Sequence, residues 1–350
     1  MARLARAEVF DSDEIAVVHV MNRTVRRCFL LGDDPYTGRN CDHRKLWMDD
    51  QLIHQAQHFG IDLLCQAIMS NHFHLVLRSR PDIVAGWDDA EVARRWLMLC
   101  PVSRDDNGQP EEPSKFDLNR IRNNKEKVAE LRRRLSDISW WMRLLSQNIA
   151  RRANKEDSEV GKFWQARYRA VRLLDETAIL ACAAYVDLNP IRAALAETIE
   201  TSDFTSAQKR AQDMQSQVVN VTPGKRRSNH LAPVELRKTS DTTPASRDHS
   251  RPRCSDRGFL PMSTAAYLGL LDWTARQQRA GKRGSTPHNV APIFDRLGIS
   301  ADVWCRLVKD FGRLFSLVAG QPDQIDAHRS KHGSHRYRTR QDARDLMASA

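Results

Sequence analysis

The alternation of apolar and polar positions near the N-terminus predicts a strand, a helix and a β-hairpin. Ile15–Val20 is a β-branched run of the kind that forms a buried strand. Apolar residues recur at helical spacing over Arg44–Phe59, and Gly60 follows as a C-terminal stop. Ile61–Met69 and His72–Leu77 are two further strands joined by a short link. The predicted order is therefore β-α-β-β.

A second set of elements follows after a polar interruption. Residues from about 81 to 130 are polar and contain several prolines, so they are expected to be an inserted loop with one helix around Asp89–Leu99. A long helix follows, and its apolar face consists of Ile138, Trp141, Leu144, Leu145, Ile149 and Ala153. A strand over Ala170–Leu173 and a helix over Glu176–Leu188 complete a domain that spans residues 10–206.

The C-terminal part of the chain divides into three segments by composition. Residues 207–257 are rich in Ser, Thr, Pro and charged residues, which is typical of a disordered basic linker. Residues 258–320 regain apolar residues at helical spacing and are expected to form a small helical module. Residues 321–350 are expected to be a basic tail.

The charge of the chain points to nucleic acid as a partner. Lys and Arg number 55 against 44 Asp and Glu, so the formal net charge is +11. Of the basic residues 43 are Arg and 12 are Lys, and the planar guanidinium suits bidentate capture of phosphates. Hydrophobic residues make up 41% of the chain, which excludes wholesale disorder.

Membrane insertion and a disulfide framework are both excluded by the sequence. No apolar run reaches the roughly 18 residues of a membrane helix, and the first residues mix Arg with Asp and Glu rather than forming a signal peptide. The seven cysteines are scattered and contain no C-x-x-C pair. We therefore expect a soluble cytoplasmic protein with no membrane partner.

The sharpest local motif is the histidine pair His72 and His74 in a predicted strand. Successive strand residues point to opposite faces, so both imidazoles project on the same side, about 7 Å apart along the strand. Two imidazoles on one face can share a metal ion. The alternative interpretation is a pair of polar residues on the wet face of an antiparallel sheet.

A basic stretch interleaved with aromatic residues lies between Arg151 and Arg172. It contains seven basic and three acidic residues together with Phe163, Trp164 and Tyr168. Guanidinium groups bind phosphates and aromatic faces stack on unpaired bases, so the expected partner is single-stranded or hairpin DNA. The alternative is a solvated charged face with the aromatic rings buried beneath it. The candidate DNA contacts are Arg23, Arg151, Arg152, Lys155, Lys162, Arg167, Tyr168 and Arg169.

Four segments resemble, in the same order, the motifs of the single-tyrosine transposases of the insertion-sequence-200 type. The similarity is greatest to the subgroup associated with repetitive extragenic palindromes. The segments are His19–Arg23 (HVMNR), Met69–His74 (MSNHFH), Gly161–Tyr168 (GKFWQARY) and Tyr185–Ala193 (YVDLNPIRA). The resemblance covers roughly residues 10–205.

The resemblance implies an α+β fold, namely a ferredoxin-like antiparallel sheet with helices on one face. It also implies a metal-dependent transposase that breaks and rejoins single-stranded DNA as a homodimer. In that chemistry His72 and His74 are catalytic and hold Mg²⁺ or Mn²⁺, while a helix-borne tyrosine attacks the phosphate. Asn154 is the best match for a third metal ligand. A C-cap or a solvated amide is the plain alternative for Asn154.

The sequence departs from the family at the nucleophile. Gln147–Asn154, where relatives carry a tyrosine, contains none. Tyr168, between two arginines, is the one substitute candidate, against a packing or base-stacking role. Three hypotheses follow: a transposase, a non-catalytic hairpin-binding derivative, and a nicking nuclease that uses metal-bound water.

Overall fold

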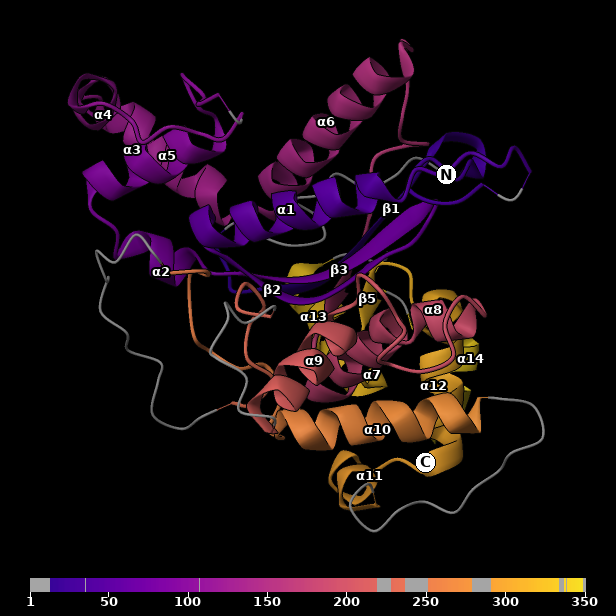
Figure 1. Ribbon diagram of the computed structural model, residues 1–350. Coiled ribbons are helices and arrows are strands. Elements are labelled where there is room, and N and C mark those ends of the chain that lie inside the picture. Colours follow the sequence, from indigo (N-terminus) through magenta and orange to yellow (C-terminus); the bar gives the residue numbers. More distant parts are fainter. Residues whose placement is uncertain are drawn as a thin grey trace.

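A five-stranded sheet forms the centre of the molecule in the computed structural model (Figure 1). The structure describes residues 13–34, 36–106, 108–218, 228–236, 251–278, 291–333, 337 and 339–348. The strands are β1 (Val17–Arg23), β2 (Ile61–Ile68), β3 (His72–Ser79), β4 (Arg169–Leu173) and β5 (Val318–Ala319). Their order is β2-β3-β1-β4-β5; β5 runs parallel to β4, and the other pairs are antiparallel. The predicted α+β class is confirmed.

The register of the sheet decides which side chains share a face. Met21 of β1 lies opposite His74 of β3 and opposite Arg169 of β4. Cross-strand partners point to the same side, so the odd-numbered residues of β1 and the even-numbered residues of β3 line one face. We call it the histidine face. Val18, Val20 and Phe73 line the other face, which we call the α6 face.

Two long helices cover the α6 face. They are α1 (His43–His58) and α6 (Ile138–Asp157), which pack on each other above the sheet (Figure 1). Trp141 and Ile149 of α6 are buried against the same core as Phe73, as their helical spacing predicts. At the C-terminal end of α6, the buried guanidinium of Arg44 contacts both Glu156 and Asp157.

The insert of residues 81–130 is helical, whereas a loop with one helix was expected. It contains α2 (Pro81–Ala85), α3 (Asp89–Leu99), α4 (Lys115–Arg122) and the first half of α5 (Lys125–Ser136). Three N-cap side chains start these helices, namely Asp88 on α3, Ser114 on α4 and Asn124 on α5. The expectation was wrong because the insert owes its helices to these caps and to packing between α3 and α5, while its overall composition is polar.

The histidine face is covered by helices as well, in addition to the face that α1 and α6 cover. The covering helices are α7 (Glu176–Asp187), α8 (Asn189–Arg192), α9 (Ser206–Val218), α10 (Thr264–Gln277) and α12 (Ala301–Leu314). In Figure 1 they lie on the side of the sheet away from α1 and α6. Helix α7 packs on β2 and β3, and α12 packs on α7. The sheet is therefore a middle layer.

The expected linker and separate helical module are part of this second layer. Asp187 at the end of α7 accepts hydrogen bonds from Ser206 Oγ (2.5 Å) and the Ala207 amide (3.1 Å) of α9, and from Tyr267 Oη (2.7 Å) of α10. His230, in the middle of the expected linker, is 3% exposed. The composition of these segments predicted a disordered linker, but contacts with the sheet face stabilise them in the folded protein. Residues 219–227 and 237–250 lie outside the described part.

The expected basic tail also contains helices. Helix α13 (Pro322–His332) and α14 (Gln341–Ala348) follow α11 (Ala291–Leu297) and α12. Ile325 and Leu346 are buried in the second layer, and Arg344 forms an ion pair with Asp326. These helices were missed because each carries few apolar residues. A short 3₁₀ turn, η2 (Val25–Arg27), follows β1.

Two broader expectations can be compared with the described residues. None of the described helices is long and apolar enough to cross a membrane. All seven cysteines are free thiols.

Candidate functional site

His72 and His74 point to the same face of β3, and a third histidine joins them. Ring atoms His19 Nε2 and His74 Nδ1 lie 2.9 Å apart, and the two imidazoles stack with their centroids 5.1 Å apart. His74 is only 2% exposed because α7 and α12 cover this face. The alternative interpretation of a wet sheet face is therefore wrong. His19 was not among the predicted site residues, although it lies in the HVMNR segment.

Hydrogen bonds to Nδ1 orient both predicted histidines. His72 Nδ1 lies 2.7 Å from Asn71 Oδ1, and the rings of His72 and His74 lie 5.1 Å apart at nearly a right angle. When Nδ1 donates to such a neighbour, the neutral ring keeps its lone pair on Nε2. This tautomer is the one in which an imidazole binds a metal ion or accepts a proton at Nε2.

The three imidazoles are held in the neutral form. Burial, followed by the charges of Arg23 and Arg192, lowers the pKa of His72 to about 4. Burial and Arg169 lower the pKa of His19 to about 3, and burial and His19 lower the pKa of His74 well below its usual value. Neutral imidazole is the form that metal ions require.

A complete metal site is absent from the described residues. No group of three His, Cys, Asp or Glu side chains in the described ranges is arranged to hold a metal ion. Asn154, the expected third ligand, lies on α6 across the sheet from the histidines, and its amide donates to the Gly161 carbonyl (3.1 Å). The structure therefore brings His72 and His74 together but leaves Asn154 apart.

A cavity of about 330 Å³ opens beside the histidine cluster, between the sheet and α12. His19 and Tyr185 form part of its wall, so two of the three rings that contact His74 reach the cavity. Its charged lining residues are Arg23, Arg169, Arg192, Lys309, Asp310 and Arg313. The excess of cations makes this cavity a candidate site for an anion.

Tyr185 is the functional candidate that the sequence reasoning set aside. Its ring lies 5.5 Å from His74 and 5.9 Å from His19, and the guanidinium of Arg192 sits 3.9 Å above its face. The hydroxyl approaches Gly312 of α12 so closely that a β-carbon there would lie 2.8 Å from it. Of the five tyrosines, all of them described, Tyr185 is the one in ring contact with His19 and His74. The sequence signal that could have identified Tyr185 was its position in the YVDLNPIRA segment.

Tyr168 is not brought to the histidine pair. It is 7% exposed, belongs to the core of the α6 face, and its hydroxyl donates to Ser139 Oγ (3.1 Å). The register places Tyr168 across the sheet from His19 and His74, because its neighbour Arg169 pairs with Met21 on the histidine face. The structure therefore assigns Tyr168 a packing role.

A second hollow, of about 380 Å³, lies along α6 on the opposite face. Its walls include Trp140, Arg143, Trp164 and Arg167. The ring of Trp140 is flanked by two guanidinium groups, those of Arg134 (4.1 Å) and Arg143 (4.6 Å). Half-exposed aromatic rings beside arginines are suited to stacking on unpaired bases. We call this hollow the tryptophan groove.

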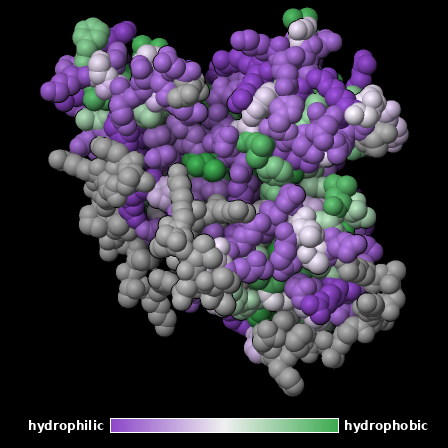
Figure 2. All heavy atoms as spheres, in the orientation of Figure 1, coloured by the Kyte–Doolittle hydropathy of each residue, from purple (hydrophilic) through white to green (hydrophobic). Residues whose placement is uncertain are grey.

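The predicted DNA-binding residues separate into two groups. Arg151, Arg152, Lys155, Lys162 and Arg167 are exposed on α6 and the segment that follows it. The surface over α3, α5 and α6 is largely hydrophilic (Figure 2). Arg23 and Arg169 line the cavity on the histidine face instead. Of the interleaved rings, Phe163 is buried, and Trp164 donates to the Ser146 carbonyl (2.8 Å).

Comparison with known proteins gives one distant likeness. No family model matches the chain, and no curated protein matches it. Among solved structures, the chain is similar to a REP-associated tyrosine transposase bound to a REP hairpin. The identity is 12% and the TM-score 0.34, over 62% of this chain and 87% of that chain. Because both values are low, the function of this chain is inferred from its own residues.

Proposed function

We propose that this chain is a transposase-like DNA-binding protein that acts on single-stranded or hairpin DNA. The observation that carries the proposal is the shared cavity on the histidine face. His19 and Tyr185, which both contact His74, line the same space as Arg23, Arg169 and Arg192. Such a space combines neutral proton acceptors with phosphate-binding cations.

The two hollows bind different parts of the nucleic acid: the cavity on the histidine face binds phosphates, and the tryptophan groove binds bases. Arginines on the histidine face bind the backbone of a strand through charge-assisted hydrogen bonds. Trp140 is half-exposed in the tryptophan groove, where an unpaired base can contact it, and Arg143 and Arg167 line the same groove. A strand end or hairpin with unpaired nucleotides matches this combination better than continuous duplex does.

His72 and His74 are proposed to hold Mg²⁺ or Mn²⁺ through their Nε2 atoms. Their Nδ1 atoms are engaged by Asn71 and His19, which fixes the ring orientations. A pair of imidazoles holds a hard ion weakly, so DNA phosphate and water complete the oxygen ligands. The bound ion would act as a Lewis acid toward the scissile phosphate.

For covalent strand transfer, Tyr185 is the proposed nucleophile. Its hydroxyl oxygen attacks phosphorus and forms a phosphotyrosine bond, the bond from phosphorus to O3′ breaks, and the strand leaves as a 3′ hydroxyl. The tyrosine proton is lost to solvent water, and the leaving oxygen takes up a proton from solvent. Contact of Tyr185 with His19 and His74 supports this assignment.

The test incubates the protein with Mn²⁺ and a hairpin oligonucleotide labelled on the 3′ side of the cut, followed by denaturing and native gels. A labelled band at protein mass supports strand transfer by a tyrosine. Free cleaved strands support the nicking nuclease, and a shifted but intact strand supports the non-catalytic hairpin-binding derivative. A wild-type protein that shifts no hairpin at low salt contradicts the proposal.

Variants and chelation test the metal. His72→Ala and addition of EDTA should abolish cleavage while the hairpin shift remains. His43→Ala is the matched control, because His43 is 43% exposed on α1 and lies outside the cluster. Cleavage that survives both His72→Ala and EDTA contradicts the metal assignment.

A further inference from the structure

We infer that helix α12 completes a phosphate-binding cavity on the histidine face, with Lys309 as a direct contact to a nucleic-acid phosphate. This inference rests on the proposed function and assigns a role to the C-terminal segment. The histidine motif and the four recognised sequence segments all precede residue 206, whereas Lys309 lies about a hundred residues later in the chain.

The cavity collects cations from elements that are far apart in sequence. Arg23 ends β1, Arg169 begins β4, and Arg192 ends α8. Helix α12 adds Lys309 and Arg313. Asp310 is the one carboxylate in the lining, and it pairs with Arg313 at 3.2 Å. No other acidic side chain in the lining balances the remaining positive charge.

Three of these cations have no acidic partner among the described residues. Within the part of the chain that the structure describes, no carboxylate lies within ion-pair distance of Arg169, Arg192 or Lys309. Burial lowers the pKa of Arg192, which indicates that its charge is poorly solvated. Arg169 and Lys309 are exposed and Arg192 is half-buried, so the desolvation cost falls on Arg192, and an anion in the cavity would offset it.

The hydrogen bonds of Arg192 attach it to the middle of α12. Its terminal nitrogens donate to the carbonyls of Val308 (3.3 Å), Lys309 (3.4 Å) and Tyr185 (3.0 Å). Its Nε is buried and has no hydrogen-bond partner. Arg192 therefore links α12 to α7, and it contributes positive charge to the cavity wall while its terminal nitrogens are bonded to backbone carbonyls.

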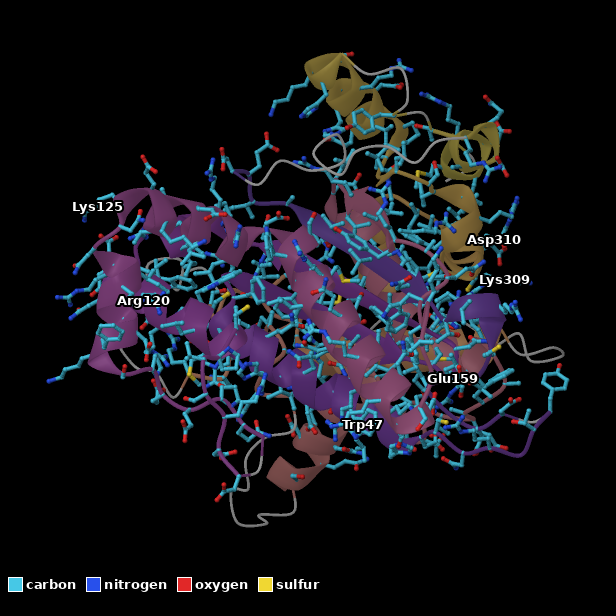
Figure 3. The ribbon with its side chains drawn as sticks, turned by 90° about the horizontal axis from the view of Figure 1, so that it is seen from above. Trp47, Arg120, Lys125, Glu159, Lys309 and Asp310 are labelled. Carbon is cyan, nitrogen blue, oxygen red and sulfur yellow. The ribbon has the colours of Figure 1, made fainter. Side chains whose placement is uncertain are left out.

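The amphipathic pattern of α12 explains why Lys309 faces the cavity. Trp304, Val308 and Phe311 of this helix are buried in the second layer. Lys309 and Arg313 follow one turn apart on the neighbouring exposed stripe. Lys309 and Asp310 lie at the outer edge of the molecule, where a strand in solution can reach them (Figure 3). The mouth of the cavity is therefore accessible while His19 forms its buried wall.

A phosphodiester fits these features better than a protein carboxylate does. Several convergent guanidinium groups and a flexible ammonium can contact the oxygens of one phosphate group. The cavity is also continuous with Tyr185 and His19, so a phosphate bound there lies next to the proposed reacting groups. The C-terminal segment thereby becomes part of the DNA site.

The test compares Lys309→Glu with the matched control Arg306→Glu, which makes the same reversal of charge on the same helix. Arg306 is exposed, lies outside the cavity lining, and forms no ion pair in the described residues. Fluorescence anisotropy with a labelled hairpin oligonucleotide, measured at several salt concentrations, gives affinity. Broadening of the ³¹P signal of inorganic phosphate reports the cavity without DNA. Circular dichroism and thermal melts check that both variants fold.

We expect Lys309→Glu to weaken hairpin binding on the order of tenfold at low salt and to reduce the salt slope by about one phosphate contact. Arg306→Glu should cause less than half of that change when the two are compared as logarithms of the affinity. Equal effects of the two variants, with wild-type binding intact, would overturn the inference but leave the proposed function standing. If the wild type binds no hairpin, the proposed function fails. In that case the ³¹P experiment still tests the cavity. If Lys309→Glu removes the broadening of the phosphate signal and Arg306→Glu does not, the cavity binds phosphate. If the broadening is the same in both variants, the cavity is rejected as a phosphate site.

Discussion

His19 Nε2 and His74 Nδ1 lie 2.9 Å apart, although the two residues are 55 positions apart in the chain. The antiparallel pairing of β1 with β3 makes this contact, because it places His19 and His74 diagonally on one face. The contact fixes the orientation of His74, and in the tautomer in which His74 Nδ1 donates to His19, His74 Nε2 keeps its lone pair.

Replacement of His19 should destabilise the fold through His74. In His19→Phe the buried Nδ1 of His74 loses its partner, which should lower the free energy of unfolding by about 1–3 kcal/mol. Urea denaturation followed by circular dichroism measures the change. His19→Gln keeps a hydrogen-bonding amide and should retain part of the stability, so equal stability of the two variants would refute the role of this contact.

Arg44 should control the acid sensitivity of the fold. Its side chain is fully buried and contacts Glu156 and Asp157, so Arg44→Met should cost about 3 kcal/mol at neutral pH. Burial alone raises the pKa of Asp157, but hydrogen bonds from Arg44 and Arg39 outweigh it and hold that pKa below the usual 3.8.

The sign of the pH effect follows from this lowered pKa. Stabilisation by the ionised Asp157 is present above the usual carboxyl pKa and is lost as the pH falls through the lowered value. The stability difference between wild type and Arg44→Met should therefore shrink below about pH 4. Arg39→Met is the control, because Arg39 is 51% exposed and contacts the same carboxylate. A difference between wild type and Arg44→Met that stays constant down to low pH would contradict the prediction.

Tyr185 and Tyr168 should behave differently in the cleavage assay. Tyr185→Phe keeps the ring that packs on His74 and removes the hydroxyl, so the protein-linked DNA product should disappear while the hairpin shift remains. Tyr168→Phe removes a hydrogen bond to Ser139 on the opposite face of the sheet and should keep the product. A protein-linked product in Tyr185→Phe would exclude Tyr185 as the nucleophile.

The tryptophan groove should contribute to the binding of unpaired nucleotides. Loss of a stacking ring costs roughly 1–3 kcal/mol per base, so Trp140→Ala should weaken the binding of a single strand about 5- to 150-fold. Fluorescence anisotropy with a single-stranded and a blunt duplex oligonucleotide measures the effect and its selectivity. Phe116→Ala on α4 is the control, since Phe116 is 70% exposed and lies outside the groove. Equal losses in both variants would argue against stacking at Trp140.

Local periodicity was sufficient for several elements of this fold. The helix around Asp89–Leu99 was predicted with the bounds that α3 has, because its start and stop lie in the sequence itself. The hairpin of β2 and β3 was also predicted close to its observed bounds. The common orientation of His72 and His74 follows from the two-residue period of a strand, which requires no knowledge of neighbouring elements.

Composition was a poor guide to the C-terminal segments. His230 and Ile325 are buried in stretches that were expected to be a linker and a tail. Short polar helices such as α13 contain too few apolar residues to be recognised alone, and they are ordered by contact with a layer that already exists.

The sequence by itself determined four of the five strands, the long α6 helix and the shared face of His72 and His74, because local alternation and helical spacing specify them. Only the tertiary structure decided what covers that face. Strand pairing brought His19 to His74, and packing of α7 and α12 brought Tyr185 and Lys309 to the same cavity. Asn154 and Tyr168 fell on the opposite side of the sheet. Such contacts depend on which distant element packs on which face, and no local period in the sequence records that choice.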